Sequence, residues 1–120
     1  MLYIVFKEVS ILLNSKISSD LIRGHIDTII LKLLLGGDKY GYEISRTVHS
    51  ASNGEYELKE ATMYSSLKRL ESEACVISYW GEETQGGRRK YYKITDKGKE
   101  LYIENKKNWE NAKKILDNLI

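Results

Sequence analysis

The sequence predicts a mainly helical domain with one small β-hairpin, an α+β fold. Three segments before residue 75 carry apolar residues at intervals of three and four, which is typical of amphipathic helices. From Val76 the apolar and aromatic residues alternate as they do in strands, and from Thr95 to the C-terminus the helical spacing returns. A chain of 120 residues is long enough for one such domain with one core.

Composition excludes several classes of protein. Hydrophobic residues make up 42% and charged residues 30%, which is ordinary for a globular protein. No apolar run approaches the roughly 18–20 residues that span a bilayer, so we predict no membrane partner. Cys75 is the only cysteine, which excludes an internal disulfide and favours a cytoplasmic location. A net charge of +2 indicates little by itself, but four of the basic residues gather within 88–93.

The first two helices are predicted from their apolar spacing and their end signals. One helix is expected from Asp20 to Leu35, with a serine cap before it and the Gly36-Gly37 pair ending it. A second is expected from Tyr40 or Gly41 to Ser50, followed by a turn at 52–54.

A third helix, predicted over 60–74, has two different faces. Met63, Leu67 and Leu70 recur at helical spacing and are expected in the core. The opposite face carries side chains that can bind phosphates or base edges: Thr62, Tyr64, Ser65, Lys68 and Arg69.

The remainder is predicted to be a hairpin followed by a long helix. Strands are expected at 76–80 and 90–94, joined by a polar loop over 81–87. Thr95 is the natural N-cap of the last helix. One stripe along this helix is apolar and has no obvious partner in so small a core, so we expect it to bind a second copy of the chain. The stripe consists of Leu101, Trp109, Ala112, Leu116 and Leu119.

Three short helices followed by a hairpin form the order of a winged helix-turn-helix, in which the third helix enters the DNA major groove. A polar helix face or a basic hairpin is usually only solvated, but here they occur together and in this order. Double-stranded DNA is therefore the predicted partner. Its contacts are expected from the third-helix face named above and from Gly87, Arg88, Arg89 and Lys90 on the hairpin.

Four stretches resemble the PadR family of bacterial winged-helix regulators: 40–44, 60–64, 68–71 and 86–98. The resemblance extends from Ser19 to the C-terminus. Stretches 51–55, 78–81 and 85–87 are further similar to the short lactococcal multidrug-resistance type, which binds flat aromatic drugs. The resemblance implies a homodimeric repressor that binds a pseudo-palindromic operator, with its last helix packed on the first helix of its partner.

This chain departs from the family pattern at two places. Many members have Gly and Pro where it has Ala61 and Ser65, although the lactococcal type lacks them too. A glycine usually follows the third helix where this chain has Ala74, and glycine is favoured there because it tolerates positive φ. Ala74 therefore predicts a strained or differently placed helix end.

Trp109 has two interpretations. It is either an aromatic residue buried in the dimer interface or the wall of a central cavity where a planar ligand stacks between two indoles. By the resemblance, that cavity also receives Leu21, Thr28, Lys32, Asn105 and Lys113. The two lysines disfavour cations, so neutral or anionic aromatic effectors such as phenolic acids are expected.

No residues show metal-ligand spacing, a phosphate loop or a nucleophile motif, so we expect neither an enzyme nor a cofactor. The predicted organisation is an N-terminal extension over 1–18, a winged helix-turn-helix over 19–95 and a dimerisation helix over 96–120. The extension is either an extra helix or the result of an upstream translation start. Two alternatives stay open: a winged-helix module that binds proteins, and a DNA-binding dimer without an effector.

Overall fold

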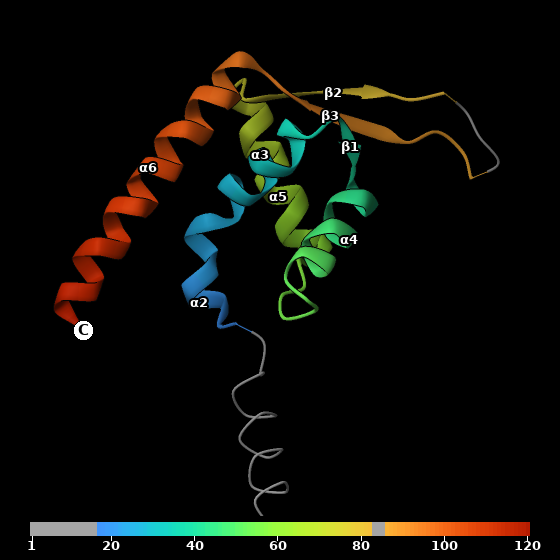
Figure 1. Ribbon diagram of the computed structural model, residues 1–120. Helices are drawn as coiled ribbons and strands as arrows, with labels where there is room; N and C mark the ends of the chain where they lie inside the picture. Colours follow the sequence, from blue (N-terminus) through green and yellow to red (C-terminus); the bar gives the residue numbers. More distant parts are fainter. Residues whose placement is uncertain (1–16, 83–85) are drawn as a thin grey trace, which may run out of the picture.

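The computed structural model describes residues 17–82 and 86–120. Its helices pack into one body, from which a β-hairpin and a long terminal helix extend in different directions (Figure 1). The predicted N-terminal extension lies almost wholly outside the described residues.

The first helix was predicted to be continuous, and this prediction is wrong. The chain forms α2 (Ser19–Ile22), a 3₁₀ turn η1 (Arg23–His25) and α3 (Ile26–Leu35). The cap is confirmed, since the Ser18 hydroxyl accepts a hydrogen bond from the backbone N–H of Asp20 at 3.2 Å. Gly24, a poor helix former, lies within η1, where the tighter winding separates α2 from α3.

The core lies between α3, α4 (Gly41–Ala51) and α5 (Glu60–Ser72). The burial of Met63, Leu67 and Leu70 confirms the prediction for the third helix. Other fully buried apolar side chains include Ile30, Leu31, Leu34, Ile44 and Val76. At the start of α4, the Glu43 carboxylate accepts a hydrogen bond from the backbone N–H of Tyr40 at 3.2 Å, and this capping box sets the first turn.

Helix α5 ends at Ser72, two residues before the predicted end. Ala74 has φ 61°, the left-handed conformation that the missing glycine indicated. This turn lets the backbone N–H of Cys75 bond to the carbonyl of Leu70 at 2.8 Å and directs the chain into the sheet.

The sheet has three antiparallel strands in the order β1-β3-β2. The predicted strands are confirmed as β2 (Val76–Trp80) and β3 (Lys90–Ile94), with Ser78 opposite Tyr92. The third strand, β1 (Lys39–Tyr40), was not predicted, because two residues are too few for an alternating pattern. We call β2, β3 and the loop between them the wing.

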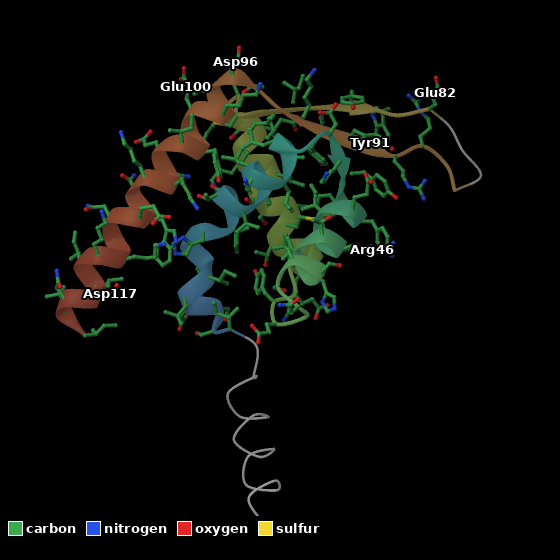
Figure 2. The ribbon with its side chains drawn as sticks, in the orientation of Figure 1. Arg46, Glu82, Tyr91, Asp96, Glu100 and Asp117 are labelled. Carbon is green, nitrogen blue, oxygen red and sulfur yellow. The ribbon has the colours of Figure 1, made fainter. Side chains whose placement is uncertain are left out.

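Helix α6 (Asp96–Leu119) begins at Thr95, whose hydroxyl accepts a hydrogen bond from the N–H of Gly98 at 3.1 Å, as predicted. Leu101 was expected in a dimer interface but packs, with Tyr102, against the core of its own chain. Beyond these residues α6 extends beside α2. Asp117, near the end of this helix, and Glu82, on the wing, lie on opposite sides of the molecule (Figure 2). No helix in the described ranges combines the length and apolar character needed to cross a membrane.

Candidate nucleic-acid interface and effector groove

Tyr64, on the exposed face of α5, and the wing line the same groove, although they are distant in sequence. This groove has a volume of about 640 Å³ and lies between the starts of α4 and α5 and one face of the wing; we call it the wing groove. Tyr64 lines it from α5, and Arg88, Arg89 and Lys90 line it from the wing. Thr62, Ser65 and Lys68 lie on the same exposed face of α5.

Aromatic rings lie beside the three cations of the wing that line the wing groove. The Arg88 guanidinium is 5.7 Å from the ring centroid of Trp80, and that of Arg89 is 4.8 Å from the ring of Tyr40. The Lys90 ammonium is 5.9 Å from the ring of Tyr92. Such contacts orient long flexible side chains. The wing therefore presents positive charge to the groove.

Six of the residues that line the wing groove were not predicted there, Trp80 and Tyr42 among them. Trp80 is 57% exposed and Tyr42 is 63% exposed, which is unusual for large aromatic side chains. Sequence reasoning assigned Trp80 to a strand but could not tell which face it would occupy. Tyr42 lies in the first turn of α4, and only the packing of α4 beside α5 brings it to this groove.

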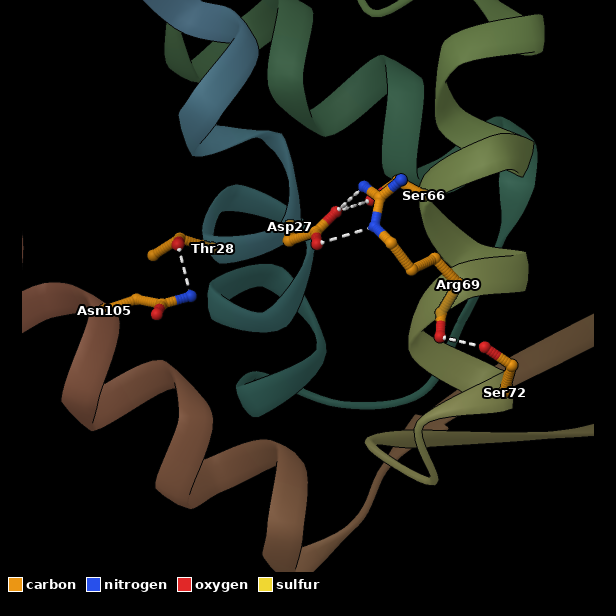
Figure 3. Close-up of polar contacts among 6 residues, drawn as sticks. All are labelled: Asp27, Thr28, Ser66, Arg69, Ser72 and Asn105. Atoms are coloured by element: carbon orange, nitrogen blue, oxygen red, sulfur yellow. Dashed lines mark hydrogen bonds and ion pairs between the residues drawn. The ribbon is translucent and has the colours of Figure 1, made fainter.

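Arg69 differs from the other predicted DNA contacts. Its guanidinium binds the carboxylate of Asp27 on α3, with Nε at 3.1 Å from one oxygen and a terminal nitrogen at 2.5 Å from the other (Figure 3). The Ser66 hydroxyl donates to the same carboxylate. The hydrogen bond to Asp27 raises the pKa of Arg69 further above its ordinary value. Periodicity predicted an exposed polar face, but it could not show that α3 lies beside one edge of it.

A second, larger groove of about 780 Å³ lies between α6 and the segment formed by α2, η1 and α3; we call it the helix groove. Four of the six predicted ligand residues line it: Leu21, Thr28, Lys32 and Trp109. Asn105 lies behind them and donates a hydrogen bond to the Thr28 hydroxyl at 3.0 Å. Lys113 has its ammonium 5.7 Å from the Trp109 ring.

Several further residues line the helix groove and were not predicted there, His25 and Lys106 among them. The ring of His25 packs edge-on against Trp109, with 4.7 Å between the ring centroids. Lys106 adds a second amine beside Lys32. Helical periodicity could not predict the contact between His25 and Trp109, because His25 lies in η1 and Trp109 lies in α6.

The charge of the helix groove is mainly positive. Asp20 is the only carboxylate among the described residues that line it, against Lys32 and Lys106. Glu110, next to Trp109, accepts a hydrogen bond from Lys113 at 2.9 Å, and this bond lowers the pKa of the Glu110 carboxyl. The groove therefore favours neutral or anionic occupants over cations.

The remaining residues of the predicted dimer stripe lie on the outer half of α6. Ala112 is half-buried, Leu116 is 45% exposed and Leu119 is 73% exposed. Cys75 is buried, and burial raises the pKa of its thiol.

This helix order, the three-stranded sheet and the cationic wing define a winged-helix protein of the DNA-binding class. Residues 30–104 match the model of the PadR-like family of transcriptional regulators, and the chain belongs to that family. It is therefore a DNA-binding transcriptional regulator.

Individual relatives are similar over most of their length. A solved transcriptional regulator from Clostridium thermocellum is 47% identical, with a TM-score of 0.81 over 87% of this chain and 98% of that one. A PadR family regulator from Clostridium difficile is 41% identical, with a TM-score of 0.69 over 79% of this chain and 97% of that one. A protein from Lysinibacillus sphaericus is 46% identical over 101 residues, which are 84% of this chain and 93% of the relative.

Proposed function

We propose that this protein is a cytoplasmic repressor of the lactococcal multidrug-resistance type, which binds a pseudo-palindromic operator as a homodimer. A planar aromatic compound in the helix groove releases it from DNA. One observation carries the DNA-binding part of the proposal: Tyr64 of the exposed α5 face lines one groove together with Arg88, Arg89 and Lys90 of the wing.

The chemistry of the wing groove suits a DNA duplex. Tyr64, with Thr62 and Ser65, offers hydroxyl groups to phosphates or base edges of the major groove. Lys68 adds charge on the same helix. Gly87 is at the tip of the wing with φ 86°, and Arg88, Arg89 and Lys90 follow it, suited to the adjacent backbone or a narrow minor groove.

Salt dependence of DNA binding tests this part. The affinity for a duplex from upstream of the gene itself is measured between about 50 and 200 mM salt. Phosphate contacts release counterions, so the logarithm of affinity should fall steeply and linearly with the logarithm of salt concentration. A scrambled duplex is the control for operator specificity. Binding that is equally weak on both duplexes at low salt would favour a protein-interaction module.

The outer half of α6 supports the homodimer. Leu116, Leu119 and Ile115 are exposed there on a helix that the rest of the described chain leaves partly uncovered. Contiguous exposed apolar side chains indicate a protein interface. Dimeric helix-turn-helix proteins bind two half-sites roughly 34–36 Å apart, so a homodimer would account for a pseudo-palindromic operator. Sedimentation tests it: the wild type should be a dimer, and Leu119→Lys should shift it towards the monomer.

The helix groove supports the effector. Its walls are largely apolar, Trp109 offers an indole face, and two lysines disfavour cations. We expect phenolic acids or similar compounds to quench Trp109 fluorescence in a Trp80→Phe variant, where Trp109 is the only tryptophan. A broad panel that quenches nothing, in a protein that binds its operator, would favour a repressor without an effector.

A further inference from the structure

Helix α3 contacts two different helices, α5 and α6, through two consecutive residues. Residues next to each other on a helix point about 100° apart, so Asp27 and Thr28 face different neighbours. Asp27 faces α5, where it binds Ser66 and Arg69, and Thr28 faces α6, where it binds Asn105 (Figure 3). One rigid helical segment thus connects the wall of the helix groove to the recognition helix α5.

The contact between Asp27 and α5 involves several hydrogen bonds. Both carboxylate oxygens are used by Arg69, and one also accepts from Ser66, which is 1% exposed. A two-pronged contact between a guanidinium and a carboxylate fixes angle as well as distance. Asp27 therefore determines how α5 lies against α3, and not only how far apart they are.

Thr28 lines the helix groove, where a bound ligand can reach it. Thr28, His25 and Trp109 all line that groove, and His25 ends the 3₁₀ turn directly before α3. A planar molecule against Trp109 must displace or repack the His25 ring, which lies 4.7 Å from the indole. Asp27 is two residues further along, so a shift of η1 moves the start of α3 and the carboxylate together.

We propose that Asp27 is a positioning residue that transmits occupancy of the helix groove to α5. The inference depends on the proposed function, because it explains how the effector site acts on the DNA site. Asp27 touches neither DNA nor effector. It acts through Arg69 and Ser66, by holding α5 at the tilt that suits the operator in the unoccupied protein.

The test uses 8-anilinonaphthalene-1-sulfonate, an anionic fused-ring dye that fluoresces in apolar sites. Energy transfer from Trp109 in the Trp80→Phe background shows that the dye lies in the helix groove. Operator affinity of the full chain is measured with and without saturating dye, and dye affinity with and without operator. In the parent protein we expect the dye to weaken operator affinity and the operator to weaken dye affinity by the same factor, about 5–150-fold, because such coupling is reciprocal.

Asp27→Asn should bind the dye as the parent does but bring the coupling factor close to one. Asp27→Glu, which keeps the charge, should restore part of the coupling. Asp96→Asn is the matched control: it removes an equivalent carboxylate, paired with Lys99 at the exposed start of α6, and should leave the coupling unchanged. If Asp27→Asn does not fold, Arg69→Gln removes the same ion pair from a more exposed position.

The outcomes separate this inference from the proposed function. A purely structural Asp27 would lower stability and operator affinity and leave the coupling factor unchanged, which would overturn the inference. Operator and dye that bind the parent without affecting each other would also overturn it, while leaving the DNA-binding function intact. Absence of operator binding would overturn both the inference and the DNA-binding function. Absence of dye at Trp109 would overturn the inference and leave the DNA-binding function intact.

A second measurement avoids variants altogether. The Nε–H group of Arg69 donates to Asp27, so its ¹⁵N-resolved NMR resonance reports on that contact. Dye added to the wild-type protein without DNA should shift this resonance. A resonance that does not move at saturation would contradict the inference.

Discussion

The ring of Tyr64 on α5 lies directly over Gly41, the first residue of α4. A Cβ atom at position 41 would stand only 2.9 Å from Cζ of Tyr64 and 3.0 Å from Cε of Met63. The absence of a side chain at Gly41 therefore lets α4 and α5 approach closely. It also sets where Tyr64 emerges into the wing groove.

Gly41→Ala should weaken operator binding, because the added methyl group forces the half-exposed Tyr64 ring to move. Alanine is normally the better helix former, so a loss rather than a gain of stability identifies the clash. We expect operator binding to weaken by about 1–3 kcal/mol and the free energy of unfolding to fall by a similar overpacking cost. Gly24→Ala is the control, since a Cβ there meets nothing within 4 Å. Unchanged operator affinity in Gly41→Ala would refute the placement of Tyr64.

Arg88→Ala should weaken DNA binding and reduce its salt dependence. Each lost phosphate contact lowers the slope of log affinity against log salt by about 0.9. Lys93→Ala removes the same charge from the same wing, but Lys93 is exposed outside the wing groove, so its slope should stay near that of the wild type. Filter binding or anisotropy at several salt concentrations measures both. Equal slopes in the two variants would show that charge alone, and not the wing groove, determines binding.

Ala74→Gly should stabilise the protein. Ala74 has φ 61°, where a Cβ costs roughly 1–2 kcal/mol and glycine costs nothing sterically. The greater freedom of glycine in the unfolded chain offsets part of this, so we expect a gain of about 1 kcal/mol in urea unfolding. Ala61→Gly, in the first turn of α5, should have the opposite sign and cost about 0.5–1 kcal/mol. Destabilisation by both substitutions would contradict the left-handed turn.

The buried thiol of Cys75 makes stability fall in alkaline solution. Burial raises the pKa of this thiol in the folded state above its ordinary value. As pH rises past the ordinary thiol range, the unfolded chain releases its proton before the folded one does, so the free energy of unfolding decreases. Between about pH 7.5 and about pH 9.5, the wild type should therefore lose more stability than Cys75→Ala. Parallel pH profiles, with the tyrosines common to both proteins, would argue against a buried thiol.

Most secondary structure could be predicted because it depends on local chemistry. The spacing of Met63, Leu67 and Leu70 showed which face of α5 is buried, and Thr95 showed where α6 begins. Two parts of the secondary structure were predicted wrongly or not at all. The Gly24 region forms a 3₁₀ turn inside an otherwise helical pattern, and β1 is a strand only because it pairs with β3.

The candidate sites could be predicted only in part. The basic residues of the wing and the hydroxyl groups of α5 were evident from residue type, as was Trp109. Their neighbours were not, because Trp80, Tyr42, His25 and Lys106 gain their places from contacts between separate elements. Arg69 shows the same difficulty: a helical pattern distinguishes polar from apolar faces, but a polar face can meet either solvent or a neighbouring carboxylate.

The sequence by itself determined the order of the main helices and of the two hairpin strands, the buried face of α5, the left-handed turn at Ala74 and the cationic wing. These follow from side-chain size, charge and backbone freedom, which each residue carries with it. Only the tertiary structure decided that Asp27 binds Arg69, that Gly41 lies under Tyr64 and that His25 packs on Trp109. Such contacts join residues 23 to 84 positions apart, and they depend on how the helices pack together, which no local pattern encodes.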